Sequence, residues 1–297
     1  MRKVKIISDS CSDLNVEQLN KYDIDFAKMS TSCDGVESVA SLTWTPEEVH
    51  AHYNKMREGK RIITAQVSVE EFQRIFEEYL KQDMDVVYIA CSSKQSGSVN
   101  TGFVTAKKLM EQYEGSTIVC IDSLNASIGI GMLAIEAAKM AKNGASAKEI
   151  EAHILSVRKK VNQYVTVHSL DALRRAGRVK GPAAFFGNLM GVKPIIISDV
   201  DGTQAAFKKV KGRQKSMEEL VALLKETIVD PENQTVYFTH SDCSQEEVDT
   251  MVSLIKQEIP CKDVEVGYIG PIVGTSIGPD ALGVWAFGKE VTYKIGD

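Results

Sequence analysis

The sequence predicts an α/β protein with two domains: a doubly wound, mostly parallel sheet domain, followed by an α+β domain with a mixed or antiparallel sheet. In the first half, short runs rich in Ile and Val alternate with helical patterns that have recognisable starts. In the second half, two strand-like runs flank an Asp-Gly turn, which indicates a hairpin. The 297 residues are enough for two domains.

Five apolar runs are the expected strands of the first domain, and they cover residues 4–10, 24–30, 62–66, 85–91 and 117–123. Thr45 precedes Pro46, which is a helix cap followed by proline at the first helical position. Capping-box spacing recurs in the pairs Ser68–Glu71 and Ser146–Glu149. Strands and helices that alternate in this way imply crossover connections and a mostly parallel sheet.

The second half begins with the hairpin, predicted over residues 191–210. Further elements follow: a helix from Ser216, a strand over 235–242, a helix from Ser244, a strand over 264–270 and a last strand near 283–289. Both helix starts have a Glu three residues later, as in a capping box. Because the last helix of the first half ends near residue 161, we expect domains over residues 1–164 and 165–297.

Composition excludes some functions and favours others. A net charge of −5 argues against nucleic acid as a partner, because phosphate binding needs a basic surface. The six cysteines have neither CxxC nor zinc spacing, so we expect reduced thiols and no metal site. No dinucleotide or P-loop motif indicates a cofactor. The chain opens directly with a strand and has no apolar run of membrane length, so we expect a cytoplasmic protein.

Small hydroxyl residues follow the predicted strands. After the strand at 85–91 come Ser92, Ser93, Ser96, Gly97 and Ser98, and Thr64 lies near the end of another strand. Ligands of doubly wound sheets bind beyond the carboxyl ends of the strands. Hydroxyls and free backbone N–H groups, with Ser98 close to a helix start, would suit a carboxylate or phosphate oxygen.

Two enzymatic alternatives stay open at this point. Ser93 or Ser96 could be a nucleophile, although the segment is no G-x-S-x-G elbow and only His168 and His240 could approach the sheet edge. Asp199 and Asp201 match the DxDGT string of haloacid-dehalogenase-type phosphatases. We favour a hairpin turn for that string, because the following residues resemble a return strand.

A basic loop, LRRAGRVKG at 173–181, includes Arg178 and either is solvated or contacts a partner or phosphate. The apolar stretch at 183–192 follows it and contains Phe185 and Phe186. A core helix is the ordinary interpretation of such a stretch. The alternative is an apolar lid over a lipid pocket, able to touch a membrane transiently.

The ordered motifs resemble the DegV family, the bacterial fatty-acid-binding subunits that work with fatty acid kinase. SDSCSDL (8–14) resembles the family's DST-x-DL, TAQVS (64–68) its TSQPS, and SSKQSGS (92–98) its SSxLSGT. Later, IDSLNASIGIG (121–131), LDALRRAGRVKG (170–181) and KPIIISDVDG (193–202) also have counterparts. GPIVGTSIGPDALGV (270–284) is similar to GPVIGTHTGPGALGV. The resemblance covers almost the whole chain, and the chain is identified as a divergent member.

The resemblance implies a non-catalytic carrier that binds a long-chain fatty acid between its domains and presents the carboxylate to the kinase for acyl-phosphate formation. Carried over, Thr64, Ser93, Ser96 and Gly97 would hold the carboxylate. Arg178 and the apolar stretch with Phe185 and Phe186 would face the kinase or gate the acyl chain. A regulatory protein that only senses an acyl ligand is a further alternative.

Two departures from the family pattern concern the same loop. Ser276 stands where the family has a histidine that helps bind the carboxylate, and Asp280 replaces a glycine. In TAQV the family's second serine and its proline are also absent. Ser276 can still donate one hydrogen bond, so we expect it to contribute to ligand binding.

Overall fold

The computed structural model describes residues 2–182, 185 and 191–296. Its first layer is a four-stranded, all-parallel sheet in the order β2-β1-β6-β7. The strands are β1 (Lys3–Asp9), β2 (Ile24–Ala27), β6 (Met84–Ala90) and β7 (Ile118–Asp122). β1 and β6 are buried over most of their length, as expected for a parallel sheet with helices on both faces.

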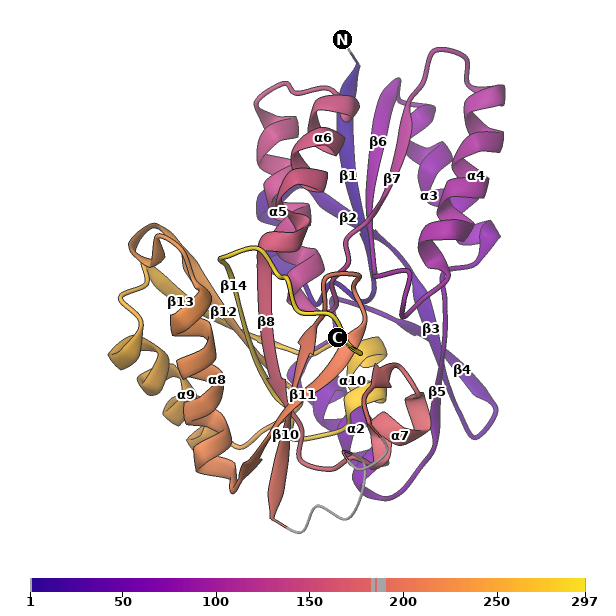
Figure 1. Cartoon of the computed structure of the whole chain (residues 1–297). Coiled ribbons are helices and arrows are strands. Elements are labelled where there is room, and N and C mark those ends of the chain that lie inside the picture. The colour runs from indigo at the N-terminus through magenta and orange to yellow at the C-terminus, as the bar shows by residue number, and fades with distance from the viewer. Residues whose placement is uncertain (1, 183–184, 186–190, 297) are drawn as a thin grey trace.

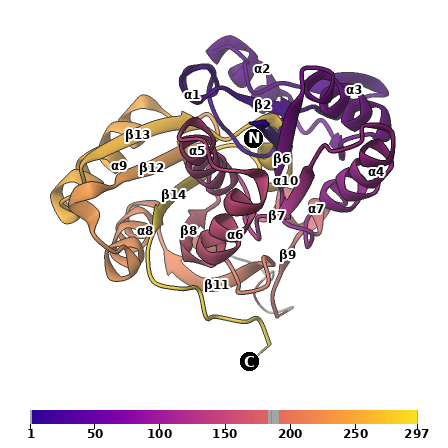
Figure 2. The same ribbon diagram turned by 90° about the horizontal axis from the view of Figure 1, so that it is seen from above.

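Helices cover both faces of this sheet. α5 (Ile128–Lys142) and α6 (Ala147–Val157) pack on one face, and α3 (Val69–Leu80) and α4 (Ser98–Gln112) on the other. Figure 2 looks down on the sheet and shows the two pairs on opposite sides, while α1 (Val16–Tyr22) lies near α5. This arrangement confirms the doubly wound sheet predicted from the alternating pattern.

A second, three-stranded antiparallel sheet extends from this layer toward the C-terminal half of the chain (Figure 1). It has the order β4-β3-β5, with β3 (Met29–Cys33), β4 (Val36–Ala40) and β5 (Ile62–Ala65). The run 24–30, predicted as one strand, therefore divides between two sheets at Lys28. The run 62–66 is a strand as predicted, but it pairs with β3 and not with the parallel sheet. The strand β4 was not predicted.

The largest sheet has seven strands in the mixed order β13-β12-β14-β8-β10-β11-β9. These are β8 (Val161–Thr166), β9 (Val179–Lys180), β10 (Val192–Ser198), β11 (Gln204–Lys211), β12 (Thr235–His240), β13 (Asp263–Tyr268) and β14 (Leu282–Phe287). The predicted hairpin, the strands of the second half and the mixed sheet are confirmed. The strand β8 lies where no strand was predicted.

α8 (Arg213–Thr227) and α9 (Gln245–Glu258) pack on one side of the seven-stranded sheet (Figure 1). The other side faces α5, whose Gly129 approaches the Trp285 ring on β14. Three shorter or flanking helices complete this region: α2 (Pro46–Arg57), α7 (Asp171–Ala176) and α10 (Pro271–Ile277). Single 3-10 turns span Arg158–Lys160 and Pro231–Asn233.

Local capping signals are confirmed at four of the five predicted helix starts. The hydroxyls of Thr45, Ser68, Ser146 and Ser244 accept hydrogen bonds from the backbone three residues later. The start at Ser216 is wrong. α8 begins at Arg213, and the Ser216 hydroxyl donates to the carbonyl of Arg213 within the first turn. A serine inside a helix can bond to the preceding turn in this way, so spacing alone cannot identify a cap.

We call the elements from β1 to α6 the N-terminal unit and those from β8 to β14 the C-terminal unit. The strand β8 spans the predicted boundary at 164/165 and belongs to the seven-stranded sheet. The division into domains at that residue stays a prediction. One large apolar core joins β1, β6 and α5 with Val165 and Trp285, so the two units share buried surface.

Candidate functional site

A cavity of about 200 Å³ lies between the two units. The N-terminal unit contributes residues from β5, from the turn after β6 and from the start of α5, and the C-terminal unit contributes residues from β8, β14, α7 and α10. One end is at the surface, because Gln66 and Gly97 are exposed. The other end is enclosed by buried residues, among them Ile196 and Trp285. Among the described residues, the cavity therefore has its mouth beside Gln66 and Gly97 and is closed on the side of Ile196 and Trp285.

The turn after β6 forms the hydroxyl-rich side of this mouth. The backbone N–H groups of Gln95 and Ser96 both donate to the carbonyl of Ser92, at 2.9 and 3.0 Å. This tight turn places Gly97 at the N-cap of α4, where the N-cap residue itself has no side chain to cap the helix. The start of α4 thus presents backbone N–H groups and a partial positive charge beside the mouth.

Gln95 is a residue of this turn that the sequence did not single out. It lines the cavity, and its Nε2 is buried without a hydrogen-bond partner among the described residues. A buried donor without a partner is unfavourable by about 1–3 kcal/mol, so such a group is an argument for a ligand oxygen nearby.

Gly97 is a site where a side chain would not fit without movement. A Cβ there would lie 2.3 Å from Oε1 of Gln66. Gln66 itself is held by a 3.0 Å hydrogen bond from its Nε2 to Oγ1 of Thr101 on α4. The Gln66 amide therefore lies directly against the start of α4 and narrows the mouth.

The structure brings five of the predicted residues to the cavity and leaves others outside it. Thr64, Ser96, Gly97, Arg178 and Ser276 all line the cavity. Of these, the Ser96 hydroxyl accepts from the Ser98 N–H at 3.2 Å and lies 2.9 Å from the Ser98 hydroxyl. The exposed Arg178 donates to the carbonyl of Ala176.

Ser93 and Ser98 do not line the cavity. Ser93 is exposed and its N–H donates to Asp122, while Ser98 is fully buried and its hydroxyl accepts from the N–H of Val67. Phe185 is buried outside the cavity, with Nζ of Lys209 5.1 Å from its ring centre. Phe186 lies outside the described residues.

The end of α10 supplies Ser276, and α10 packs against α2, α7, β3 and β5. His52 of α2 lies close by, with its Nε2 3.3 Å from Oγ1 of Thr275. Burial, reinforced by Lys55, lowers the pKa of His52 to about 4, so the ring is neutral at neutral pH. His52 does not line the cavity, so it does not stand in for the family histidine at position 276.

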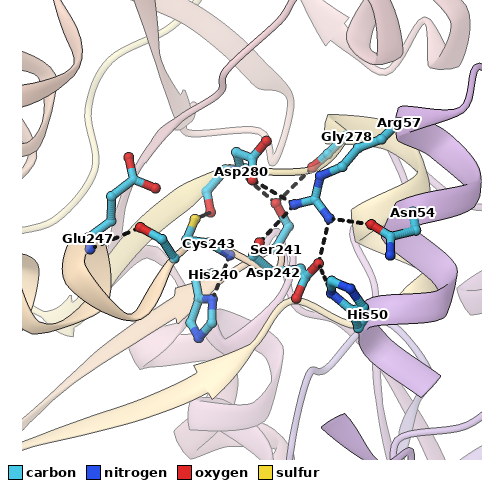
Figure 3. Close-up of polar contacts among 12 residues, drawn as sticks. His50, Asn54, Arg57, His240, Ser241, Asp242, Cys243, Glu247, Gly278 and Asp280 are labelled. Atoms are coloured by element: carbon cyan, nitrogen blue, oxygen red, sulfur yellow. Dashed lines mark hydrogen bonds and ion pairs between the residues drawn. The ribbon is translucent and has the colours of Figure 1, made fainter. Parts of the chain in front are cut away.

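A cluster around Arg57 fixes the loop that follows α10 (Figure 3). Its guanidinium donates to Oδ2 of Asp242 at 2.6 Å and to Oδ1 of Asp280 at 2.7 Å. His50, two turns earlier on α2, lies 2.9 Å from the same Asp242 oxygen. Asp280, the departure noted in the sequence, thus binds α2 of the N-terminal unit to the loop behind Ser276.

The loop is also held from within the C-terminal unit. The Ser241 hydroxyl donates to the carbonyl of Gly278 at 2.8 Å and accepts from the N–H of Ala281 at 2.6 Å (Figure 3). The Asp280 N–H donates to the Ser241 carbonyl at 2.8 Å. Asp280 has a φ of 61°, a left-handed conformation that glycine adopts without a steric cost. This explains the glycine that the family resemblance gives at this position.

Two buried carboxyl groups organise the loops under the cavity. Asp9 accepts from the N–H groups of Cys11 and Cys91 and from the Tyr88 hydroxyl, and burial raises its pKa. Asp13 accepts from the Ser127 hydroxyl and from the N–H of Gly270, just before α10. Burial raises the pKa of Asp13 to about 7. Because each carboxyl group accepts hydrogen bonds from separate segments of the chain, both act as structural links.

The DVDGT string is a hairpin turn, as predicted. The Asp199 carboxylate accepts from the N–H groups of Asp201 and Thr203 at 3.0 and 2.8 Å, and Gly202 has a φ of 83°. The turn connects two antiparallel strands, whereas the phosphatase motif follows a parallel strand. Its Gly202 carbonyl accepts from the buried Ser92 hydroxyl at 2.8 Å, which links the turn to the N-terminal unit.

Within the described residues, no group of three or more His, Cys, Asp or Glu side chains could hold a metal ion. In the same part of the chain, no helix is long and apolar enough to cross a membrane. Besides Gln95, the sequence also missed the cavity residues Gln163, Gln204 and Trp285, which lie in separate strands. Only the strand order brings them together.

The fold and the cavity define a two-unit α/β protein with a largely apolar cavity between its units and a polar mouth. The model of the DegV family, described as uncharacterised proteins, matches residues 3–289, and the chain belongs to this family. A DegV domain-containing protein of Clostridium perfringens is 36% identical over 290 residues, which is 97% of this chain and 98% of that protein.

Two solved structures from Thermotoga maritima are also similar. One is described as a DegV lipid binding protein; it is 27% identical, has a TM-score of 0.84 and is aligned over 98% of this chain and 100% of its own. The other is described as revealing a fatty acid binding function; it is 26% identical, has a TM-score of 0.83 and is aligned over 97% of this chain and all of its own. The predicted family and fold class are confirmed.

Proposed function

We propose that the protein binds a long-chain fatty acid in the cavity, with its carboxylate at the mouth and its acyl chain in the enclosed part. The observation that carries this proposal is the distribution of polar groups. Thr64, Ser96 and the unpartnered Nε2 of Gln95 gather at the mouth beside the uncapped start of α4. An anion is favoured at this place by hydrogen-bond donors and by the helix dipole.

The walls further in suit an acyl chain. Met29, Val165, Ile196, Ile269 and Ile272 are among the apolar residues that line the cavity. Each methylene that leaves water for such an environment contributes about 0.8 kcal/mol, so a chain of many methylenes binds tightly even with few polar contacts. The similar structure described as fatty acid binding supports this ligand class.

We further propose that the protein presents the carboxylate to a fatty acid kinase, as the family resemblance implies. The exposed Gln66, Gly97 and Arg178 surround or line the mouth, so a partner could reach the carboxylate there. Arg178 is the basic residue placed to contact that partner or to gate the chain. Because such a kinase uses ATP, the proposal locates both proteins in the cytoplasm.

The same geometry favours a carrier over an enzyme. The Ser96 hydroxyl is hydrogen-bonded to Ser98, and no histidine lines the cavity within the described residues, so a serine nucleophile would lack its base. The carboxylate of Asp199 already accepts two backbone N–H groups in its turn. The hydrolase alternative therefore has no assembled site in the described part of the chain.

The proposal is tested by extracting the purified protein and identifying the released lipid by mass spectrometry. We expect a fatty acid of roughly 14–18 carbons, as the family resemblance implies, and each of its buried methylenes would add about 0.8 kcal/mol to binding. Gln95→Ala, which removes the unpartnered donor, should weaken binding of a fluorescent fatty acid by about 10-fold or more, the size expected for a hydrogen bond to a charged group. Ser93→Ala, at an exposed residue outside the cavity, is the matched control and should bind as the wild type does.

A protein that contains no fatty acid and binds none when it is added would overturn the proposal. Equal affinity of Gln95→Ala and the wild type would show that the carboxylate lies elsewhere. Turnover of the bound fatty acid to acyl-phosphate by a purified kinase, lost on Arg178→Ala with affinity unchanged, would support the presentation step.

A further inference from the structure

We propose that the cavity prefers a fatty acid whose acyl chain carries an oxygen, as a hydroxyl or keto group, because a row of amide side chains crosses its sheet wall. The inference rests on the proposed function and names the class of acyl chain that the site selects. It comes from two glutamines, Gln163 and Gln204, that line the enclosed part of a cavity whose neighbouring walls are apolar.

The row follows from the register of four adjacent strands. Trp285 of β14 stands opposite Gln163 of β8, and Ser198 of β10 stands opposite Gln204 of β11. The pairing of β8 with β10 sets Val165 against Ile196 and Thr166 against Ile195. Continued by two residues, this antiparallel register brings Gln163 level with Ser198. All four side chains therefore lie in one line across the sheet.

Hydrogen bonds join the row from end to end. Trp285 Nε1 donates to Oε1 of Gln163 at 3.4 Å, and Nε2 of Gln163 donates to Oε1 of Gln204 at 2.5 Å. Nε2 of Gln204 then donates to the Ser198 hydroxyl at 2.6 Å. Each amide is held by one donated and one accepted hydrogen bond, so its remaining donor and acceptor positions have fixed directions.

The next row along the strands is different. Val165 and Ile196, two residues from Gln163 and Ser198, lie on the same face of the sheet and also line the cavity. One band of the wall is thus made of amides and the adjacent band of aliphatic side chains. A pocket for an unsubstituted alkyl chain would need only aliphatic side chains.

The amides have hydrogen-bonding capacity beyond the row. A glutamine amide carries two N–H donors and two acceptor positions. The contacts above use one donor and one acceptor of each glutamine. Gln163 and Gln204 are only 4% and 7% exposed, so bulk water does not satisfy the rest. An alkyl chain over the row would leave these groups unpaired, whereas a chain hydroxyl can both donate and accept, and a keto oxygen can accept.

The test is a competition experiment with the full chain. A bound fluorescent fatty acid is displaced by one saturated acid and by derivatives that carry a single hydroxyl or keto group at successive positions. For the wild type, we expect at least one derivative to bind about tenfold more tightly than the parent acid, the size of one buried hydrogen bond. The position of that derivative would locate the row along the chain.

The double variant Gln163→Leu/Gln204→Leu should reduce this preference to about one while it still binds the parent acid. Ile196→Val is the matched control in the aliphatic band; it can change both affinities but should keep their ratio. If the double variant does not fold, the single variant Gln204→Met replaces it. It should also reduce the ratio of the affinity for the oxygenated derivative to the affinity for the parent acid.

The inference is wrong if the wild type binds the parent acid as tightly as every derivative, or if a preference survives removal of the glutamines. In both cases fatty acid binding itself would stand. If the wild type binds neither the parent acid nor any derivative, the inference and the proposed function are both overturned.

Discussion

Replacement of Asp280 separates two contributions to the stability of the loop behind Ser276. The first is the ion pair with Arg57, whose side chains are 31% exposed for Arg57 and 30% for Asp280. A pair this accessible contributes at most about 1 kcal/mol. The second is the backbone, which has a φ of 61° at Asp280. A left-handed conformation costs a residue with a Cβ about 1–2 kcal/mol, and glycine pays no such steric cost.

Two variants separate the contribution of the ion pair from that of the backbone conformation. Asp280→Gly loses the ion pair but also removes the steric strain, and it gains disorder in the unfolded chain worth about 0.4–1 kcal/mol. We expect its free energy of unfolding to stay within about 1 kcal/mol of the wild type. Asp280→Ala loses the ion pair and keeps the strained backbone, so it should be less stable than Asp280→Gly by about 1 kcal/mol.

Urea unfolding at a fixed pH measures both variants, provided that the m-values agree with the wild type. Glu258→Ala is a suitable control, because Glu258 pairs with Lys225 at the surface, 3.0 Å away, and should change stability by less than about 0.5 kcal/mol. Equal stability of Asp280→Ala and Asp280→Gly would refute the backbone argument. A loss of more than about 3 kcal/mol in Asp280→Gly would show that the ion pair matters far more than its exposure suggests.

Three further predictions concern the cavity and its surroundings. Ser276→His should tighten fatty acid binding, because it adds a hydrogen-bond donor at a residue that lines the cavity. An unchanged affinity in a fluorescence titration would show that the end of α10 does not contact the carboxylate. Asp199→Asn keeps the acceptor for the turn and should leave fatty acid binding intact, whereas a magnesium-dependent phosphatase activity lost in this variant would establish the hydrolase alternative. Burial raises the pKa of Asp13 from 3.8 to about 7, so the folded state holds this proton more tightly than the unfolded state does. The free energy of unfolding should therefore fall as pH rises from about 4 to 7. Asp13→Asn should flatten that part of the curve of urea midpoint against pH, and a curve identical to that of the wild type would contradict the assignment.

Local chemistry made much of the fold predictable from the sequence. The starts of α2, α3, α6 and α9 follow from a hydroxyl that binds the backbone three residues on, which is a property of four or five consecutive residues. The hairpin from β10 to β11 follows in the same way from Asp-Gly between two apolar runs. The hydroxyl-rich turn after β6 was also predicted to lie at a ligand site, and it forms one side of the cavity mouth.

Partner choice between strands could not be predicted in the same way. The run at 62–66 has the composition of any short strand, and its pairing with β3 depends on where the chain leaves the first sheet at Lys28. β8 was missed because Asn162 and Gln163 interrupt its apolar pattern. Both are buried and hydrogen-bonded to residues more than 40 positions away, so their role exists only in the folded sheet.

Trp285 gives the cavity an optical signal of its own. The chain has two tryptophans, and the other, Trp44, lies just before α2 and beside His52 and Tyr53. The indole of Trp285 is 1% exposed and lines the cavity, so its emission depends on whether water or an acyl chain lies against the ring. In a Trp44→Phe variant, Trp285 in the cavity wall is the only source of tryptophan fluorescence. Occupancy and exchange of an unlabelled lipid can then be followed in real time.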